Sequence, residues 1–175
     1  MPSARHLSHL VSRFFGSLRP GGPTAADDAW ATAALLPGEV VLWRRMSGAD
    51  RRHAVGVARR TEAALGDAAT RPVLAAALLH DVGKVDSGFG PVRRALATVA
   101  GMAAGHTTAE RWSERRGVVG RTGRYLCHDR LGADMLRAAG SDLLTVAWAR
   151  EHHLDPARWT VAPPVARALK DADDD

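Results

Sequence analysis

The chain has 175 residues, of which 46% are hydrophobic and 25% charged, and its net charge at pH 7 is +5. A sequence of this length and composition predicts one globular domain with a sizeable core, which excludes an intrinsically disordered protein. The basic residues are scattered and lack interleaved aromatic residues, so we expect no specific nucleic-acid binding and favour an anionic, phosphate-containing small molecule as the partner.

Three further properties bear on the cellular compartment. Cys127 is the only cysteine, which excludes an intramolecular disulfide and favours a reducing compartment. No apolar segment approaches the roughly 20 residues that span a bilayer, and the N-terminus lacks the apolar region of a signal peptide. We therefore expect a cytoplasmic protein, and the sequence does not indicate its oligomeric state.

Residues 5–18 carry apolar side chains at spacings of three and four, which predicts an amphipathic helix. The proline- and glycine-rich segment 20–23 ends this helix. We therefore divide the chain into a basic amphipathic arm and linker at 1–24 and a domain at 25–175. The arm packs back onto the domain, contacts a partner or a membrane surface, or is a poorly ordered tail.

The rest of the chain is rich in alanine and leucine, and no strand-like alternation persists, so we expect an all-α bundle. Asp27 or Asp28 is expected to cap the first helix of the domain, and residues 85–90 are expected to form a loop. The predicted helices cover residues 30–35, 39–46, 50–65, 71–79, 91–103, 129–139, 143–154 and a last helix that begins at Pro163.

The most informative stretch is the apolar run 73–79, which is followed by His80-Asp81-Val82-Gly83-Lys84. Because the run is apolar on nearly all sides, it predicts a buried helix. A buried, charged Asp81 is costly unless it is paired, and a metal ion would satisfy both His80 and Asp81. A plain His-Asp helix cap is the alternative. Gly83 can end the helix, which leaves Lys84 able to meet an anion.

Five other histidine and arginine positions are candidates for the same site. His53 lies on the inward face of a predicted helix, and Arg52 beside it could reach a phosphate. His128 immediately precedes another predicted helix, where its side chain can point back to a site. His152 and His153 follow at the end of a third, and a rotation of about 100° per residue places His153 nearer the apolar stripe of that helix.

The acidic C-terminal segment contains one further candidate ligand. Acidic tails are usually exposed to solvent, but helical phase separates these residues. Asp173 lies four residues after the apolar Leu169 and therefore points inward, whereas Asp171 and Asp174 fall off the apolar face. An inward carboxylate at the end of the last helix suits a metal site.

In chain order the candidate metal ligands are His53, His80, Asp81, His128, His152, His153 and Asp173. Over about residues 40–173, the order His…His-Asp…Asp resembles the HD-domain superfamily of metal-dependent phosphohydrolases. The sequence His-Asp-Val-Gly-Lys is similar to the HDIG/HD-GYP branch. His128 and the paired histidines match the additional ligands of its binuclear members.

Two departures from the HD-GYP pattern bear on substrate and metal. The segment after His153 lacks the Glu and the Gly-Tyr-Pro motif, and Ala49 stands where some members carry a metal-bridging Glu. Both departures speak against a cyclic-di-GMP assignment and favour one or two metal ions over three.

The resemblance implies a helical bundle that binds one or two divalent ions of Mn, Fe, Ni, Co or Zn. Asp81 and Lys84 are the catalytic candidates: Asp81 would bridge two ions, and Lys84, with Arg52 as a second candidate, would bind the substrate phosphate. The expected activity is that of a phosphomonoesterase or phosphodiesterase acting on a nucleotide or cyclic dinucleotide through a metal-activated water. The alternatives are a regulatory or binding module without turnover and a purely structural helical protein.

Overall fold

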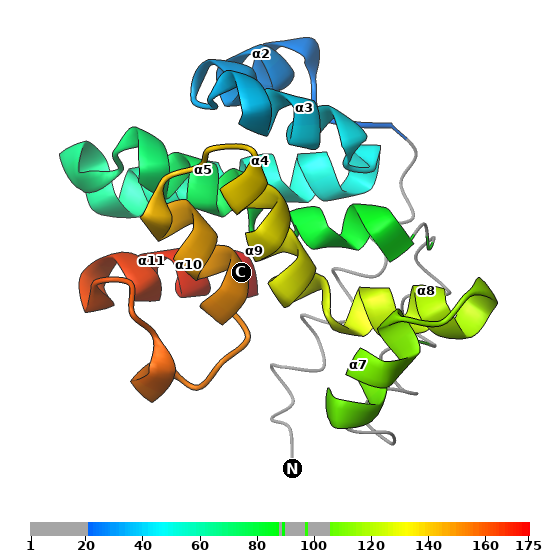
Figure 1. Cartoon of the computed structure of the whole chain (residues 1–175). Coiled ribbons are helices and arrows are strands. Elements are labelled where there is room, and N and C mark those ends of the chain that lie inside the picture. Colours follow the sequence, from blue (N-terminus) through cyan, green and yellow to red (C-terminus); the bar gives the residue numbers. More distant parts are fainter. Residues whose placement is uncertain (1–20, 88, 90–96, 98–105) are drawn as a thin grey trace.

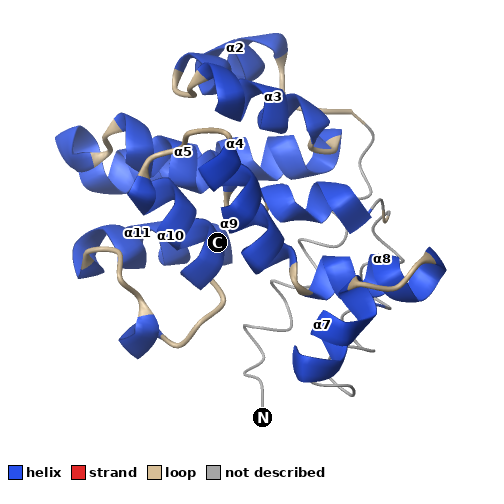
Figure 2. Ribbon diagram, in the orientation of Figure 1, coloured by secondary structure: helices blue, strands red, loops and turns tan. Residues whose placement is uncertain are grey.

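The computed structural model describes residues 21–87, 89, 97 and 106–175, and within these residues it contains helices and no strands (Figure 2). The all-α prediction is therefore confirmed. The amphipathic arm expected at 5–18 and most of the helix expected at 91–103 lie outside the described residues. No helix in the described part of the chain is both long and apolar enough to cross a lipid bilayer.

Helix α5 (Arg71–Leu79) lies at the centre of the bundle (Figure 1). Its residues 75–79 are all fully buried, as expected for a helix that is apolar on nearly all sides. It packs against α4 (Gly48–Leu65) and α10 (Leu143–Glu151), and more lightly against α3 (Pro37–Arg45). The C-terminal end of α5, which carries the His-Asp pair, is therefore enclosed by other helices.

The remaining helices surround this centre. Helix α11 packs along α4, α9 packs on α10, and α7 and α8 form a pair beside the bundle that contacts the short 3-10 helix η2 (Figure 1). Their bounds are α2 (Ala25–Ala33), η1 (Gly66–Ala68), η2 (Val82–Ser87), α7 (His106–Ser113), α8 (Gly117–Leu126), α9 (His128–Ala138), η3 (Pro156–Arg158) and α11 (Pro163–Asp174).

The start of the first described helix differs from the prediction. Helix α2 begins at Ala25 rather than Trp30, and its cap is Thr24, whose hydroxyl accepts a hydrogen bond from the backbone N–H of Asp27 at 3.1 Å. The expected caps Asp27 and Asp28 lie inside the first turn, where their negative charge suits the helix dipole.

Two predicted segments also end at different residues. Helix α10 ends at Glu151 rather than Leu154, and the loop expected to begin at residue 85 is helical up to Ser87 within η2. His152 directly follows α10 and keeps the helical geometry, since its backbone N–H donates to the carbonyl oxygen of Trp148 at 3.0 Å.

A glycine allows η2 to lie directly against α9. A Cβ atom on Gly83 would lie 1.9 Å from the carbonyl oxygen of His128 and 2.7 Å from the backbone nitrogen of Gly132. No other residue type fits at such a distance, so the glycine after the His-Asp pair brings that pair next to the start of α9.

Candidate metal centre

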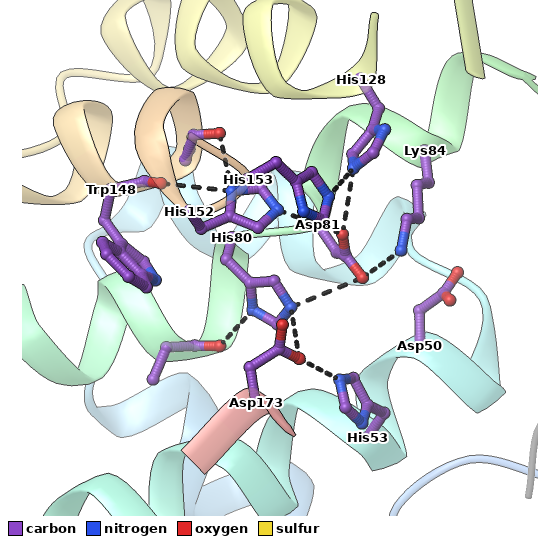
Figure 3. A network of polar contacts seen from close by, with 12 residues as sticks. Asp50, His53, His80, Asp81, Lys84, His128, Trp148, His152, His153 and Asp173 are labelled. Carbon is purple, nitrogen blue, oxygen red and sulfur yellow. Dashed lines mark hydrogen bonds and ion pairs between the residues drawn. The ribbon is translucent and has the colours of Figure 1, made fainter. Parts of the chain in front are cut away.

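Seven side chains from five separate helices or helix ends converge at one place in the bundle (Figure 3). They fall into two groups whose ligand atoms lie close enough to share an ion. The members of the first group, called the trio below, are His53, His80 and Asp173. The members of the second, called the quartet, are Asp81, His128, His152 and His153. All seven residues predicted as ligands are therefore brought together, and their role as ligands stays a prediction.

The trio joins the end of α11 to α4 and α5. Oδ1 of Asp173 lies 2.9 Å from Nε2 of His53 and 3.5 Å from Nε2 of His80. Asp173 is only 4% exposed, whereas Asp171 and Asp174 are exposed. The inward orientation expected from helical phase is confirmed.

Asp81 connects the trio to the quartet. Its Oδ1 lies 3.4 Å from Nε2 of His128 and 3.8 Å from Nε2 of His152. Its Oδ2 lies 3.5 Å from Nε2 of His80. His153 completes the quartet, with its Nε2 3.2 Å from Nε2 of His128. One carboxylate thus presents a different oxygen to each group.

Three of the histidines are oriented by the backbone of their own helix or turn. Nδ1 of His80 lies 2.9 Å from the carbonyl oxygen of Ala77, and Nδ1 of His128 lies 2.8 Å from that of Tyr125. His152 makes the same contact with the preceding turn of α10, at 3.0 Å. A carbonyl only accepts, so each Nδ1 carries a proton and turns Nε2 towards the centre. Metal-binding histidines are held in this way in proteins.

The residues fit a metal ion because the centre contains buried polar atoms without partners. Nε2 of His80, Oδ1 of Asp81 and Nε2 of His152 are all buried and form no hydrogen bond. Leaving such atoms unpaired costs about 1–3 kcal/mol each. A divalent transition metal, which takes imidazole nitrogen and carboxylate oxygen, would satisfy all three. A plain His-Asp helix cap would account for neither the third atom nor the convergence of five elements.

The histidines of the centre differ in their pKa values. Burial disfavours a charge on His80, but the carboxylates of Asp81 and Asp173 outweigh it and raise the pKa of His80 to about 10. Burial lowers the pKa of His152 and of His153, and their positively charged neighbours add to that effect. At neutral pH the quartet therefore contains neutral imidazole nitrogens with lone pairs available to an ion.

Two basic residues were predicted to bind phosphate. Lys84, in η2, forms an ion pair with Oδ2 of Asp81, and together with His80 it outweighs burial and holds the pKa of Asp81 well below its usual value. Arg52 donates a hydrogen bond to the carbonyl oxygen of Gly21 at 2.7 Å, in the segment before α2. Lys84 is thus part of the centre, and a role of Arg52 in phosphate binding stays a prediction.

The sequence misjudged the paired histidines and overlooked one acid. His152 is 1% exposed and His153 is exposed, the reverse of the predicted preference. The buried face of α10 carries Thr145, Trp148 and Ala149, and His152 continues that face by helical rotation. Asp50 lies one turn before His53 on α4 and points towards Lys84 in Figure 3, while Ser47 donates to its carboxylate at 2.7 Å. Asp50 could have been recognised from the sequence, because it lies three residues before His53 and residues three apart on a helix are neighbours.

Comparison with known proteins agrees with this arrangement. The model of the HD domain family matches residues 51–175, which include all seven converging side chains. No curated protein and no solved structure matches the chain. Because the match covers most of the sequence, the chain belongs to the HD domain family, within the superfamily of metal-dependent phosphohydrolases.

Proposed function

We propose that this protein hydrolyses a phosphate ester of a nucleotide or cyclic dinucleotide with the help of two divalent ions. The observation that carries the proposal is the set of three buried, unpaired atoms on His80, Asp81 and His152, which face a common centre. The membership in a superfamily of metal-dependent phosphohydrolases supports the same reaction class.

In this proposal each ligand group holds one ion. The trio would hold the first and the quartet the second, with Asp81 shared because its two oxygens face different histidines. Ions there would act as Lewis acids that activate water and offset the charge of the phosphoryl group. Mn, Fe, Ni, Co and Zn all accept this mixed nitrogen and oxygen ligand set.

Lys84 is proposed to bind a non-bridging oxygen of the substrate phosphate. In the structure its ammonium group pairs with the carboxylate of Asp81. An additional positive charge at Asp81 would repel that ammonium and leave it available for an anion at the same place. A flexible lysine side chain suits this exchange of partners, since it carries a point charge rather than a fixed fork.

The substrate class follows from two features of the sequence. The segment His-Asp-Val-Gly-Lys is similar to the HDIG/HD-GYP branch, which supports a nucleotide or cyclic dinucleotide, and the net charge of +5 favours an anionic substrate. The missing Gly-Tyr-Pro motif leaves nucleoside monophosphates and other phosphodiesters as candidates beside cyclic dinucleotides.

Replacing Asp81 with Ala tests the centre itself. The variant loses the carboxylate shared by both groups, so we expect it to bind no metal and to lose hydrolysis altogether. Elemental analysis of the purified protein measures the first effect. Assays with Mn or Ni on cyclic dinucleotides, nucleoside monophosphates and bis(p-nitrophenyl) phosphate measure the second. Unchanged metal content in Asp81→Ala would refute the site.

Replacing Lys84 with Met separates substrate binding from metal binding. We expect an unchanged metal content and a decrease in kcat/KM of about 10- to 100-fold, because a charged contact to phosphate is worth about 1.5–3 kcal/mol. Lys170→Met is the matched control, since Lys170 is the only other lysine and pairs with Asp174 on the surface of α11. An equal loss of activity in both variants would contradict the role of Lys84.

The same assays test the alternative function. A protein that binds metal with Asp81 but turns over no member of the panel would be a regulatory or binding module that retains the HD fold. A protein that releases product, and stops doing so in Asp81→Ala, is an enzyme.

A further inference from the structure

The C-terminal end of α11 is held more firmly than a helix end usually is. Ala172 and Asp173 are each only 4% exposed, although α11 ends at Asp174. The last four carbonyl groups of a helix lack partners within it, so such ends tend to fray. A metal ligand at this place needs an additional restraint.

Arg60 of α4 supplies a contact to this end. Its Nε and Nη2 atoms donate to the carbonyl oxygen of Ala172 at 3.0 Å and 2.7 Å. This carbonyl is among the last four of α11, and a positive charge there also suits the negative end of the helix dipole. Two donors on one oxygen restrain the backbone directly before Asp173.

Helix α4 therefore contacts α11 at two consecutive residues. His53 and Arg60 are seven positions apart, which is close to two helical turns, so both side chains leave the same face of α4. His53 contacts the carboxylate of Asp173 at 2.9 Å, while Arg60 contacts the carbonyl of Ala172. Fixing the backbone at Ala172 limits how far the Asp173 carboxylate can move from His53 and His80.

We propose that Arg60 is a positioning residue that places Asp173 for metal binding by the trio. The inference rests on the proposed function, because it assigns Arg60 to one of the two metal sites. Arg60 touches neither substrate nor reacting atoms and acts through Asp173 alone. The quartet contains no residue of α11, so loss of Arg60 weakens the trio and leaves the quartet unchanged.

The variant Arg60→Met, titrated with Mn²⁺, tests this assignment. We expect the wild type to bind two ions, and Arg60→Met to bind one with unchanged affinity and the other about 10- to 100-fold more weakly, as found for residues that orient metal ligands. Arg60→Lys keeps a donor and gives an intermediate loss. Arg59→Met is the control, since neighbouring Arg59 lies over Trp30 and pairs with Glu62. It leaves both affinities unchanged.

A second measurement needs no metal. Amide hydrogen exchange of residues 173–175 in metal-free protein reports the placement of the helix end, and we expect faster exchange in Arg60→Met but not in Arg59→Met. Should the wild type bind no Mn²⁺, the proposed function fails, while faster exchange still supports placement of Asp173 by Arg60. Unchanged exchange overturns the inference. Equal weakening of both ions also overturns it, because it indicates a general structural role.

Discussion

Two positively charged side chains lie beside the carboxylate of Asp81. Lys84 pairs with one of its oxygens, and protonated His80 lies 3.5 Å from the same oxygen. These two cations stand where a metal ion would supply charge, so the carboxylate is compensated before any ion arrives. An ion that binds at Asp81 would therefore replace the positive charges of Lys84 and protonated His80 by its own charge.

This exchange predicts that metal affinity depends on pH. The pKa of His80 is raised from 6.5 to about 10, so at neutral pH an ion at the trio must displace its proton. We expect the apparent affinity of the trio for Mn²⁺ to rise about tenfold per pH unit between about pH 6.5 and pH 8.5. Calorimetry in two buffers of different ionisation enthalpy should show release of about one proton.

The same titration of His80 has the opposite effect on the stability of the fold without a bound ion, which decreases as the pH rises. Because the pKa of His80 is higher in the folded than in the unfolded chain, its protonation stabilises the fold fully below about pH 6.5. That contribution is lost as the pH rises through about 10.

The predicted pH dependence of metal affinity can be contradicted directly. An affinity of the trio for Mn²⁺ that stays constant with pH, without proton release, would show that His80 is neutral before the ion binds.

At the scale of single residues, helical phase was a sound guide only where the buried face of the helix had been identified correctly. The phase of α11 identified Asp173, because Asp173 follows the apolar face of the helix and the helix stays regular up to Asp174. The same reasoning reversed His152 and His153, since the buried face of α10 carries Thr145, Trp148 and Ala149, whereas Leu143, taken as part of the apolar stripe, is 83% exposed. The contact of Arg60 was not predictable, because its partner is a backbone carbonyl 112 residues away, which no side-chain pattern reveals.

At the scale of elements, the contact of η2 with α9 brings the two halves of the quartet together. The His-Asp pair precedes η2, and His128 begins α9. Gly83 is the residue at which these elements meet, because a side chain there would overlap the carbonyl group of His128. The glycine of the His-Asp-Val-Gly-Lys motif is therefore needed for packing as well as for the turn.

We expect Gly83→Ala to separate η2 from α9. The added Cβ would lie 1.9 Å from a backbone oxygen that cannot move alone, so the overlap should lower the free energy of unfolding by about 1–3 kcal/mol. The shift of His128 relative to Asp81 should also weaken metal binding by the quartet. Denaturant unfolding measures the first effect and a Mn²⁺ titration the second.

Gly22→Ala is the matched control for this change. A Cβ atom at Gly22 would meet its nearest neighbour, an atom of Arg51, at an ordinary 3.5 Å. We expect its effect on stability to stay within about 0.5 kcal/mol. If the two variants were equally stable, the close approach at Gly83 would not restrict the residue type there.

Several helices of the bundle were predictable, whereas α7 and α8 were not predicted, and the ends of the predicted helices were less certain. Apolar periodicity located α4, α5, α10 and α11, since each buries one stripe or nearly its whole surface. The start of α2 was missed because Thr24 competes with Asp27 and Asp28, and all three are good capping residues. Sequence alone does not decide between neighbouring caps of similar strength.

At the scale of the whole molecule, the candidate ligands connect helices from both halves of the chain. An ion bound to the folded arrangement and not to the unfolded chain stabilises the fold. At a Mn²⁺ concentration of about 100 times Kd we expect a gain of about 2.7 kcal/mol, or about 5–10 °C in Tm for a protein of this size. Thermal unfolding with Mn²⁺ and with a chelator measures the difference.

The variant Asp81→Ala serves as the control for this measurement. Since it lacks the shared carboxylate, its Tm should be the same with Mn²⁺ and with the chelator. A wild-type Tm that does not respond to either addition would mean that the centre takes up no ion under these conditions.

The span of the trio along the chain has a consequence for biosynthesis. His53 and Asp173 are 120 residues apart, and the ribosome adds about 5–20 residues per second. A nascent chain therefore carries His53 for on the order of ten seconds before its partner exists. During that interval, the early histidines are exposed to whatever metals the ribosome's surroundings contain. The trio is complete only once Asp173 has been synthesised, so an ion held by all three residues would be bound after α11 has emerged.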